Sequence, residues 1–266
     1  MMQADTLKVE RRGHWLFVTL SRPKRRNAMN RKMVEELTNV AQTVREEGAV
    51  RAVILRGTDG HFCAGGDVSD MAGAMNAVQE TDPIATLNRS FGHMLEAVDT
   101  LPCAVIAVCE GAVMGGGFGL ACVADVTLAA SSARFRLPET SLGITPAQIA
   151  PFIVRRLGHS HARRLAVTGQ TIRPEEAVRL GLAHVLANGD ETVDDILDAT
   201  LERIRRCEPT AVAATKSLVD RTGSMPLAAL LDDAATEFSA LVRRPEAKAG
   251  MTAFLRRQPA PWDQEN

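Results

Sequence analysis

Glycine residues dominate one stretch of the chain, and their spacing favours a site for a negatively charged oxygen. The stretch runs from Glu110 to Ala130 and reads EGAVMGGGFGLACVADVTLAA. Its glycines are Gly111, Gly115, Gly116, Gly117 and Gly119. A glycine run followed by apolar residues predicts a turn into a helix, whose first amide N–H groups have no partner within the helix. Glycine also lets a substrate atom approach the backbone closely, so we expect an oxyanion site, with a structural turn as the alternative.

A second glycine loop could complete such a site. It reads HFCAGGDVSD, from His61 to Asp70, and each of the two loops follows a predicted buried strand, at 52–56 and at 104–108. If these strands are neighbours, amide groups from both loops can converge on one carbonyl oxygen, where removing a single donor typically costs about 3–4 kcal/mol.

Composition and missing motifs exclude several other functions. The chain has 266 residues, a net charge of −1 and no tyrosine, which argues against a nucleic-acid surface or a polybasic membrane patch. The glycine run does not match the dinucleotide-binding pattern, and no GxxxxGK[ST] loop occurs. His159 and His161 have the wrong spacing for metal ligands on one helix face. Met114 stands where a hydrolase would place its nucleophilic serine.

The cysteines and the N-terminus indicate the compartment. The cysteines form no CxxC pair and mostly lie in apolar runs, which is typical of reduced core residues: Cys63, Cys103, Cys109, Cys122 and Cys207. No apolar segment of a secretory signal is visible at the N-terminus. The glycine-rich stretch is a poor membrane span because Asp125 interrupts it. We therefore expect a cytoplasmic protein without a nucleic-acid or membrane partner.

The remaining sequence predicts strands and helices in alternation, followed by helices. Residues 7–10 and 15–20 predict a hairpin around Gly13. Asn30 is suited to cap a helix that ends at Gly48, and Asp82 precedes the start of another. Further strands are predicted at 126–130 and 134–136, and helical segments at 152–157, 161–168, 174–180 and from 194 onward. We expect a mixed α/β body over residues 1–195 and a helical region over residues 196–266.

Three segments resemble the signature regions of the crotonase, or enoyl-CoA hydratase/isomerase, superfamily. They are HFCAGGDVSDM, EGAVMGGGFGLACVAD and FRLPETSLGITPAQIAPF, and SRPKRRNAM and MTAFLRR also match, so that the resemblance covers essentially the whole chain in order. PAQIAPF and GGGFGLAC are most similar to isohexenylglutaconyl-CoA hydratases and somewhat less to methylglutaconyl-CoA hydratases. The resemblance implies an α/β crotonase (ClpP-like) spiral of ββα turns. It also implies a C-terminal helical region that builds trimers, usually paired into hexamers.

The resemblance also assigns a binding mode for an acyl-CoA substrate. The amide groups of Ala64 and Gly116 would hold the thioester carbonyl, which favours the enolate-like transition state over the ground state. Basic residues of the SRPKRRNAM loop could meet CoA phosphates or form a solvated turn. No metal and no cofactor beyond the coenzyme A moiety are implied. The resemblance implies that Gly65, Gly66 and Asp67 line the path of the adenine and pantetheine groups. The basic residues of the loop are Lys24, Arg25 and Arg26, and Phe254 and Arg257 would reach the coenzyme A of a neighbouring subunit.

The sequence departs from the family pattern at one catalytic position. Familiar hydratases carry two glutamates, whereas here Gly119 takes the first place and only Glu139 remains. Glu139 could take a proton from water and pass it to carbon, provided that an apolar pocket raises its pKa. A single glutamate is also the pattern of Δ3,Δ2-enoyl-CoA isomerases, and a catalytically silent acyl-CoA-binding scaffold is a further alternative. The residues expected to form this apolar pocket are Phe118, Leu137, Leu142 and Ile144.

Polar residues near the expected acyl pocket could set the choice of substrate. Asn88, Arg89 and Gln148 are the candidates. Arg89 could bind the distal carboxylate of a glutaconyl-type acyl group, although such an arginine more often solvates a helix face. The sequence thus predicts an enoyl-CoA hydratase, acting on a branched glutaconyl-type thioester, with isomerisation as the alternative reaction.

Overall fold

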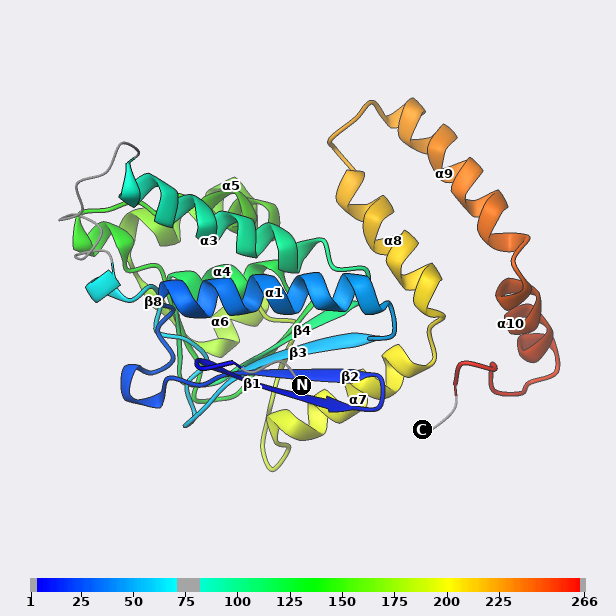
Figure 1. Ribbon diagram of the computed structural model, residues 1–266, viewed down its shortest axis with the longest axis horizontal. Helices are drawn as coiled ribbons and strands as arrows, with labels where there is room; N and C mark the ends of the chain where they lie inside the picture. The colour runs from blue at the N-terminus through cyan, green and yellow to red at the C-terminus, as the bar shows by residue number, and fades with distance from the viewer. Residues whose placement is uncertain (1–3, 71–81, 264–266) are drawn as a thin grey trace.

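A six-stranded, mostly parallel sheet forms the centre of the computed structural model, which describes residues 4–70 and 82–263 (Figure 1). β1 and β2 form the predicted antiparallel hairpin, and every other neighbouring pair in this sheet is parallel. In spatial order its strands are β1 (Leu7–Arg12), β2 (Trp15–Leu20), β3 (Ala52–Gly57), β4 (Ala104–Cys109), β6 (Val126–Ala129) and β9 (Val185–Leu186). β3 and β4 are therefore neighbours, as the oxyanion hypothesis requires.

A smaller sheet extends from the first. It consists of β5 (Ala112–Met114), β7 (Arg134–Arg136) and β8 (Thr171–Ile172), in that order. The order strand, strand, helix recurs along the chain, and it confirms the predicted α/β spiral of ββα turns. β5, β8 and β9, of two or three residues each, were not predicted, although the three-residue β7 was.

Alternate residues of the central strands bury their side chains on opposite faces of the sheet. Val53 and Leu55 of β3 pack into one core, on the face of the sheet that four helices cover. Ile54 packs into a separate core beneath α7 (Val193–Arg205), on the opposite face. Both faces of a parallel sheet are covered in this way, which explains why β3 and β4 read as continuous apolar runs. The helices of the first core are α1 (Arg31–Glu47), α3 (Pro83–Asp99), α4 (Gly116–Val123) and α5 (Ala150–Thr168); α6 (Pro174–Arg179) follows them.

The predicted helix ends are confirmed by their caps. The Asn30 side chain accepts a hydrogen bond from the Met33 amide, and Gly48 ends α1 with φ +61°. The Asp82 side chain caps α3 in the same way. Gly158, with φ +71°, breaks α5 into the two predicted segments, because only glycine adopts this conformation without strain.

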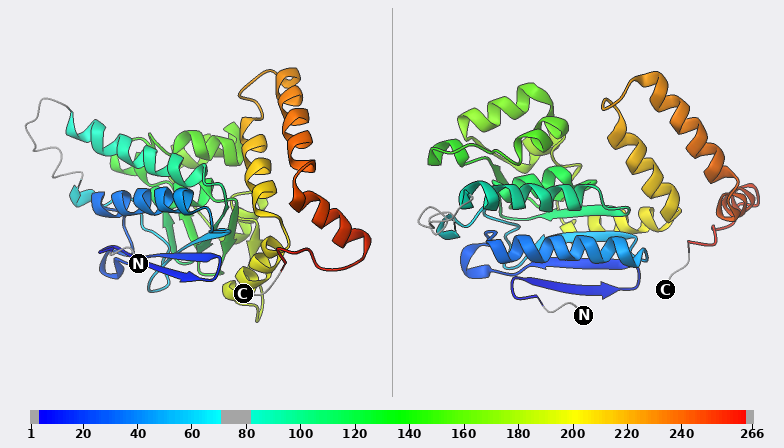
Figure 2. Two further views of the ribbon diagram at one scale, coloured as in Figure 1. Left: turned by 45° about the vertical axis from the view of Figure 1, so that its right-hand side comes forward. Right: turned by 45° about the horizontal axis from the view of Figure 1, so that its top comes forward.

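The last three helices form an arm that stands away from the body in each view (Figure 2). The arm comprises the α-helices α8 (Pro209–Arg221), α9 (Leu227–Val242) and α10 (Pro245–Leu255). α7 packs on the sheet through buried side chains and precedes the arm. The arm exposes large apolar side chains, which are Val219, Leu227, Leu231, Phe238, Val242, Met251, Phe254 and Leu255.

None of the described helices is long and apolar enough to cross a membrane. Across residues 4–70 and 82–263, no group of three or more histidine, cysteine, aspartate or glutamate side chains could hold a metal ion.

Candidate active site

The glycine run of the sequence begins α4, as predicted. Gly115 precedes the helix with φ +48° and ψ −113°, a conformation that favours glycine, and Gly116 is the first helical residue. The Gly115 amide donates to the Arg136 carbonyl at 3.0 Å, which ties the turn to β7. The Gly116 amide has no hydrogen-bond partner among the described residues and faces a cavity. The turn therefore presents a free donor at a helix N-terminus.

The second glycine loop is joined to the first by backbone hydrogen bonds. The Cys63 amide donates to Ala112 at 2.8 Å, and the Met114 amide donates to Cys63 at 2.9 Å. A Cβ on Gly65 would lie 3.3 Å from the Met114 carbonyl oxygen and 3.8 Å from Gly115 Cα, so only glycine allows this contact comfortably. The two loops therefore converge, as the neighbouring strands predicted.

The prediction that Ala64 supplies an oxyanion donor is wrong. Its amide donates to the Arg26 carbonyl at 3.0 Å, and the Gly65 and Asp67 amides are also bonded, to Cys63 Sγ at 3.4 Å and to the Met29 carbonyl at 2.8 Å. Gly66 is the exception in this run, because its amide has no partner in the described part of the chain and the residue lines the cavity. The donor pair that the geometry supports is Gly66 with Gly116.

Glu139 lies beside this donor pair. It begins the short 3₁₀ turn η2 (Glu139–Leu142), and its Oε1 is 2.9 Å from where a Cβ on Gly115 would stand. Its Oε2 is buried and has no hydrogen-bond partner within the part of the chain that the structure describes. Burial raises the pKa of Glu139 above its usual value of 4.5, the direction that a proton-transferring carboxyl group near neutral pH requires.

The predicted apolar surroundings of Glu139 are correct only in part. Ile144 lines the same cavity, but Leu142 is 59% exposed and does not line it. Phe118 and Leu137 are buried in the core and do not line the cavity. The apolar wall is formed instead by residues that include Met29, Phe91 and Ile149.

The cavity has a volume of about 470 Å³ and lies between the start of α1, α3, α4 and the segment that follows η2. Its apolar wall and few converging polar groups are typical of a small-molecule site. Asn88 and Gln148 both line it and contact each other, since Gln148 Nε2 donates to Asn88 Oδ1 at 2.9 Å. The polar residues around it are Asn30, Arg31, Asp67, Asp70, Asp82, Asn88, Glu139, Thr145 and Gln148.

Arg89 does not line the cavity, contrary to the sequence-based expectation for a residue that contacts the acyl group. Its Nη2 pairs with Glu96 at 2.9 Å on the exposed side of α3. Its Nη1 is 3.5 Å from Gln148 Oε1, so Arg89 lies behind the amide of Gln148. A Cβ on Gly92 would fall 2.1 Å from Gln148 Oε1. Gly92 therefore makes the space in which the Gln148 amide rests.

Asp67 is held by an ion pair that sequence reasoning missed. Arg22 Nη2 donates to Asp67 Oδ2 at 2.8 Å, and both side chains are largely buried. Burial acts to raise the pKa of Asp67, but hydrogen bonds from Arg22 and Ser69 outweigh it and hold that pKa below its usual value. Arg22 occurs in the basic loop SRPKRRNAM, but nothing in the sequence distinguishes it from its neighbours.

The remaining residues expected to contact coenzyme A lie on exposed surfaces. Lys24, Arg25 and Arg26 are exposed on and after η1 (Pro23–Arg25), and within residues 4–70 and 82–263 they form no ion pair. Phe254 is 83% exposed at the end of α10, and Arg257 follows it with φ +53°. Neither lines the active-site cavity of its own chain.

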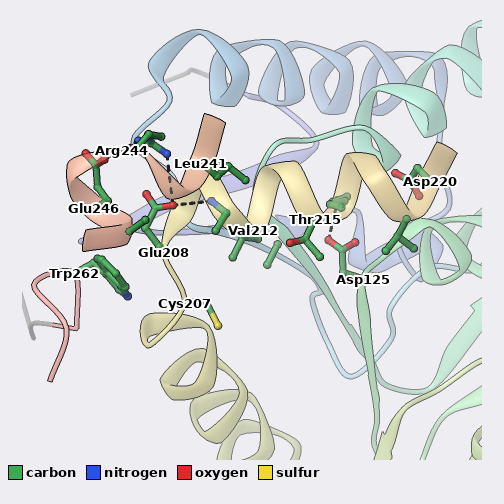
Figure 3. Close-up of a pocket in the computed structure, with 15 residues that line it drawn as sticks. Asp125, Cys207, Glu208, Val212, Thr215, Asp220, Leu241, Arg244, Glu246 and Trp262 are labelled. Atoms are coloured by element: carbon green, nitrogen blue, oxygen red, sulfur yellow. Dashed lines mark hydrogen bonds and ion pairs between the residues drawn. The ribbon is translucent and has the colours of Figure 1, made fainter. Parts of the chain in front are cut away.

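A larger cavity, of about 750 Å³, lies between the arm and the body (Figure 3). Its wall is mainly apolar, with Val212 and Leu241 on the arm and Cys207 at the end of α7. Lys216 of α8 bonds Asp125 Oδ2 at 2.8 Å beside it and so ties the arm to the body. It contains neither glycine loop nor Glu139, so the chemistry belongs to the smaller cavity.

Comparisons with known proteins agree with this geometry. The family model described as enoyl-CoA hydratase/isomerase matches residues 11–265. An enoyl-CoA hydratase of Alternaria alternata is 34% identical over 205 residues, which are 77% of this chain and 66% of that protein, so the chain spans just under two thirds of its length. The 2,3-dehydroadipyl-CoA hydratase of Escherichia coli is 29% identical over 95% of this chain and 96% of that protein. A solved enoyl-CoA hydratase/isomerase structure from Marinobacter aquaeolei superposes with a TM-score of 0.94 and 47% identity, over 97% of this chain and 99% of that chain.

Proposed function

The chain belongs to the enoyl-CoA hydratase/isomerase family, and from that premise we propose that it adds water to an α,β-unsaturated acyl-CoA thioester. The observation that carries the proposal is the buried Oε2 of Glu139 in one cavity with the amides of Gly66 and Gly116, none of which has a hydrogen-bond partner among residues 4–70 and 82–263. A buried carboxylate oxygen without a partner is costly in a folded protein, which favours a role toward a bound molecule.

The two amides hold the thioester carbonyl oxygen. Addition of water to the β-carbon moves negative charge onto that oxygen, and donors fixed beforehand stabilise this charge without reorganisation. The amide of Gly116 has the positive end of the α4 dipole behind it, which adds to the effect. Each donor of this kind is worth about 3–4 kcal/mol of transition-state stabilisation.

Glu139 carries the proton in both halves of the reaction. Its carboxylate takes a proton from water as the water oxygen bonds to the β-carbon, and the double-bond electrons move toward the carbonyl oxygen. The protonated Glu139 then gives that proton to the α-carbon and regains its charge. A water molecule is added overall, and a single acid suffices because it is restored at the end.

Isomerisation of a 3-enoyl thioester is the second candidate reaction, and the absence of an acid at position 119 favours it. The same carboxylate would remove a proton from the α-carbon and return it to the γ-carbon, through the same enolate held by the same amides. The reaction requires no activated water, so the two candidates differ in whether water reaches the β-carbon.

Assays of the wild-type protein and Glu139→Gln on 2-enoyl and 3-enoyl thioesters separate the candidates. Hydration consumes the absorbance of the conjugated 2-enoyl thioester, whereas isomerisation of a 3-enoyl thioester creates it. We expect hydration by the wild type and a loss on the order of 10²- to 10⁴-fold in Glu139→Gln, with binding retained. Binding without either reaction would instead identify an acyl-CoA-binding scaffold and reject the proposal.

The finer proposal is a branched glutaconyl-type acyl group, such as isohexenylglutaconyl-CoA, whose distal carboxylate is bound near Asn88 and Gln148. The side-chain amides of Asn88 and Gln148 line the cavity, and Arg89 places a positive charge behind Gln148. Gln148→Met should raise KM for a branched glutaconyl thioester several-fold and leave KM for crotonyl-CoA unchanged. Glu96→Gln, beside Arg89 but outside the cavity, is the matched control. Equal changes for both thioesters in Gln148→Met would reject this choice of substrate.

We further propose that the arm assembles the chain into a trimer, or a pair of trimers, with Phe254 and Arg257 reaching the coenzyme A of a neighbouring subunit. The exposed apolar side chains of α9 and α10 support this, because a monomer rarely leaves such a surface uncovered. Lys24, Arg25 and Arg26 are proposed to meet the phosphates from the subunit that binds the acyl group. Sedimentation of wild type and Phe238→Glu tests the assembly.

A further inference from the structure

We infer that Arg156 is a positioning residue for the reaction: it holds the C-terminal end of α4 and adds positive potential at the oxyanion donor of the other end. The inference rests on the proposed function, because it concerns the amide of Gly116. α4 has eight residues, so its two ends are only about 12 Å apart.

The guanidinium group of Arg156 binds the last carbonyl groups of α4. Its Nε donates to the Cys122 carbonyl at 3.1 Å, and its Nη2 donates to the carbonyls of Ala124 and, at 3.5 Å, Ala121. The Thr127 hydroxyl donates to the same Ala121 carbonyl at 2.8 Å. Because every residue of α4 is buried, these groups depend on protein partners rather than on water.

The charge of Arg156 has no acidic partner in the described ranges, 4–70 and 82–263. Its neighbour Arg155, in contrast, pairs with Asp99. Asp125, just beyond α4, bonds Lys216 and the Val105 amide instead. Burial lowers the pKa of Arg156, but an arginine keeps its proton near neutral pH. A full positive charge therefore faces the end of α4 with no ion-pair partner among the described residues, and Asp125 and Asp99 act on it only from a distance.

His184 lies next to this guanidinium group. Its Nδ1 accepts a hydrogen bond from the Thr127 amide at 2.9 Å, and its Nε2 lies 3.1 Å from Nη1 of Arg156. Burial first, and then the charge of Arg156, lower the pKa of His184. The ring is therefore neutral at neutral pH, and because Nδ1 accepts, its proton is on Nε2. The ring thus adds no second full charge beside Arg156 and accepts no hydrogen bond from it.

A cation at this end of α4 helps an anion at the other. The C-terminal end of a helix carries partial negative charge, which opposes the effect of the N-terminal end on an oxyanion. Arg156 cancels that negative charge, and its own positive charge acts through the low-dielectric interior. At about 12–15 Å the effect is on the order of three- to tenfold in rate. Because the charge on the carbonyl oxygen develops in the transition state, kcat should change more than KM.

Two substitutions separate the charge from the hydrogen bonds. Arg156→Gln keeps a donor for the carbonyls without the charge, whereas Arg156→Lys keeps the charge with fewer donors. Arg155→Gln is the matched control, because it removes a charge one residue away that pairs with Asp99 and donates to none of the α4 carbonyl groups in the described part of the chain. The readouts are kcat, KM and the absorbance of bound 4-dimethylaminocinnamoyl-CoA, a chromophore that shifts to the red when its carbonyl oxygen is polarised.

We expect Arg156→Gln to lower kcat three- to tenfold with KM within about twofold, and to reduce the red shift. Arg156→Lys should keep most of the shift, and Arg155→Gln should keep all of it. If Arg156 only capped the helix, Arg156→Gln and Arg156→Lys should change kcat and the red shift equally. That result, or an unchanged red shift in Arg156→Gln, would overturn the inference. If Arg156→Gln does not fold, Arg156→Lys alone decides. Loss of the red shift in a folded Arg156→Lys would overturn the inference, and a retained red shift would support it. Absence of both hydration and a red shift in the wild type would instead overturn the proposed function.

Discussion

Ile149 occupies the place that a side chain on Gly119 would need. Its Cγ2 lies 2.5 Å from where a Cβ on Gly119 would stand, and Leu95 Cδ1 lies 3.4 Å from the same point. Ile149 is itself buried, at 3% exposure, and follows directly on Gln148 of the cavity wall. Position 119 therefore lacks an acid and also lacks room for one, because Ile149 fills the space that its side chain would need.

Restoring the acid with Gly119→Glu should consequently destabilise the protein and not improve hydration. Forcing a larger side chain into a packed core typically costs about 1–3 kcal/mol, and burying a carboxylate adds to it. Ile149→Ala should be destabilising alone by about 2–5 kcal/mol. The double variant should lose less than the sum of the two, because each change relieves the other. Urea unfolding of the four proteins measures this coupling, and strictly additive losses would show that the two positions do not compete for space.

Gly115→Ala should separate catalysis from binding. The added Cβ would meet Glu139 Oε1 at 2.9 Å, and alanine at φ +48° with ψ −113° is strained, at a cost of about 1–3 kcal/mol. We expect kcat to fall at least tenfold through displacement of the carboxyl group, with a smaller change in KM. Gly48→Ala, also at positive φ but with open space around it, is the control for strain alone. A similar loss of kcat in both variants would contradict a specific effect on Glu139.

The rate should depend on pH through Glu139. Burial raises its pKa above 4.5, so kcat/KM should rise with pH to a plateau, with a midpoint above 4.5, as the carboxylate forms. A midpoint at or below 4.5, measured where substrate binding is at equilibrium, would show that another group controls the rise of kcat/KM with pH.

The same shift predicts an effect on stability. Between the pKa of the unfolded chain and the raised pKa of the folded protein, the folded state holds a proton that the unfolded state has released. The free energy of unfolding should therefore fall as pH rises through this window. Glu139→Gln removes this contribution, so its stability relative to wild type should increase from pH 4 to pH 8 in urea titrations. A difference independent of pH would contradict the shift.

The sequence predicted the features that depend on local chemistry. Asn30 and Gly48 bound α1 because a side-chain cap and a left-handed conformation require those residue types. The two glycine loops were identified for the same reason, since their chemistry can be read from residue type and spacing. Glu139 was identified through the resemblance to a known family. β3 and β4 were recognised by their continuous apolar runs, which a buried parallel strand requires.

Features that depend on long-range contacts could not be predicted. The choice between Ala64 and Gly66 is decided by the Arg26 carbonyl, 38 positions earlier in the chain, which takes the Ala64 amide. Arg89 was expected to face the substrate, but Glu96 holds it on the outside of α3. Ile149 fills the space beside Gly119 from a separate segment. No local pattern contains these partners.

The ion pair between Arg22 and Asp67 provides the last prediction, because it joins the basic loop to the loop that carries Gly66. Asp67 also accepts a hydrogen bond from the Ser69 amide at 3.0 Å, so its carboxylate orders the turn that follows the donor. Removing one partner of a largely buried pair typically costs about 3 kcal/mol. Asp67→Asn should therefore lower stability by about this amount and raise KM for enoyl-CoA, since the Gly66 amide loses its support.

The pH dependence distinguishes this effect from a general loss of packing. The pKa of Asp67 is lowered in the folded protein, so its contribution is present above 3.8, the usual value, and is lost as pH falls through the folded pKa. The difference in unfolding free energy between wild type and Asp67→Asn should thus shrink below pH 4. Glu35→Gln, which breaks the exposed pair with Arg31, should change stability by less than about 1 kcal/mol and serves as the control. A gap between wild type and Asp67→Asn that persists at pH 2 would show that the charge of Asp67 does not hold these loops together.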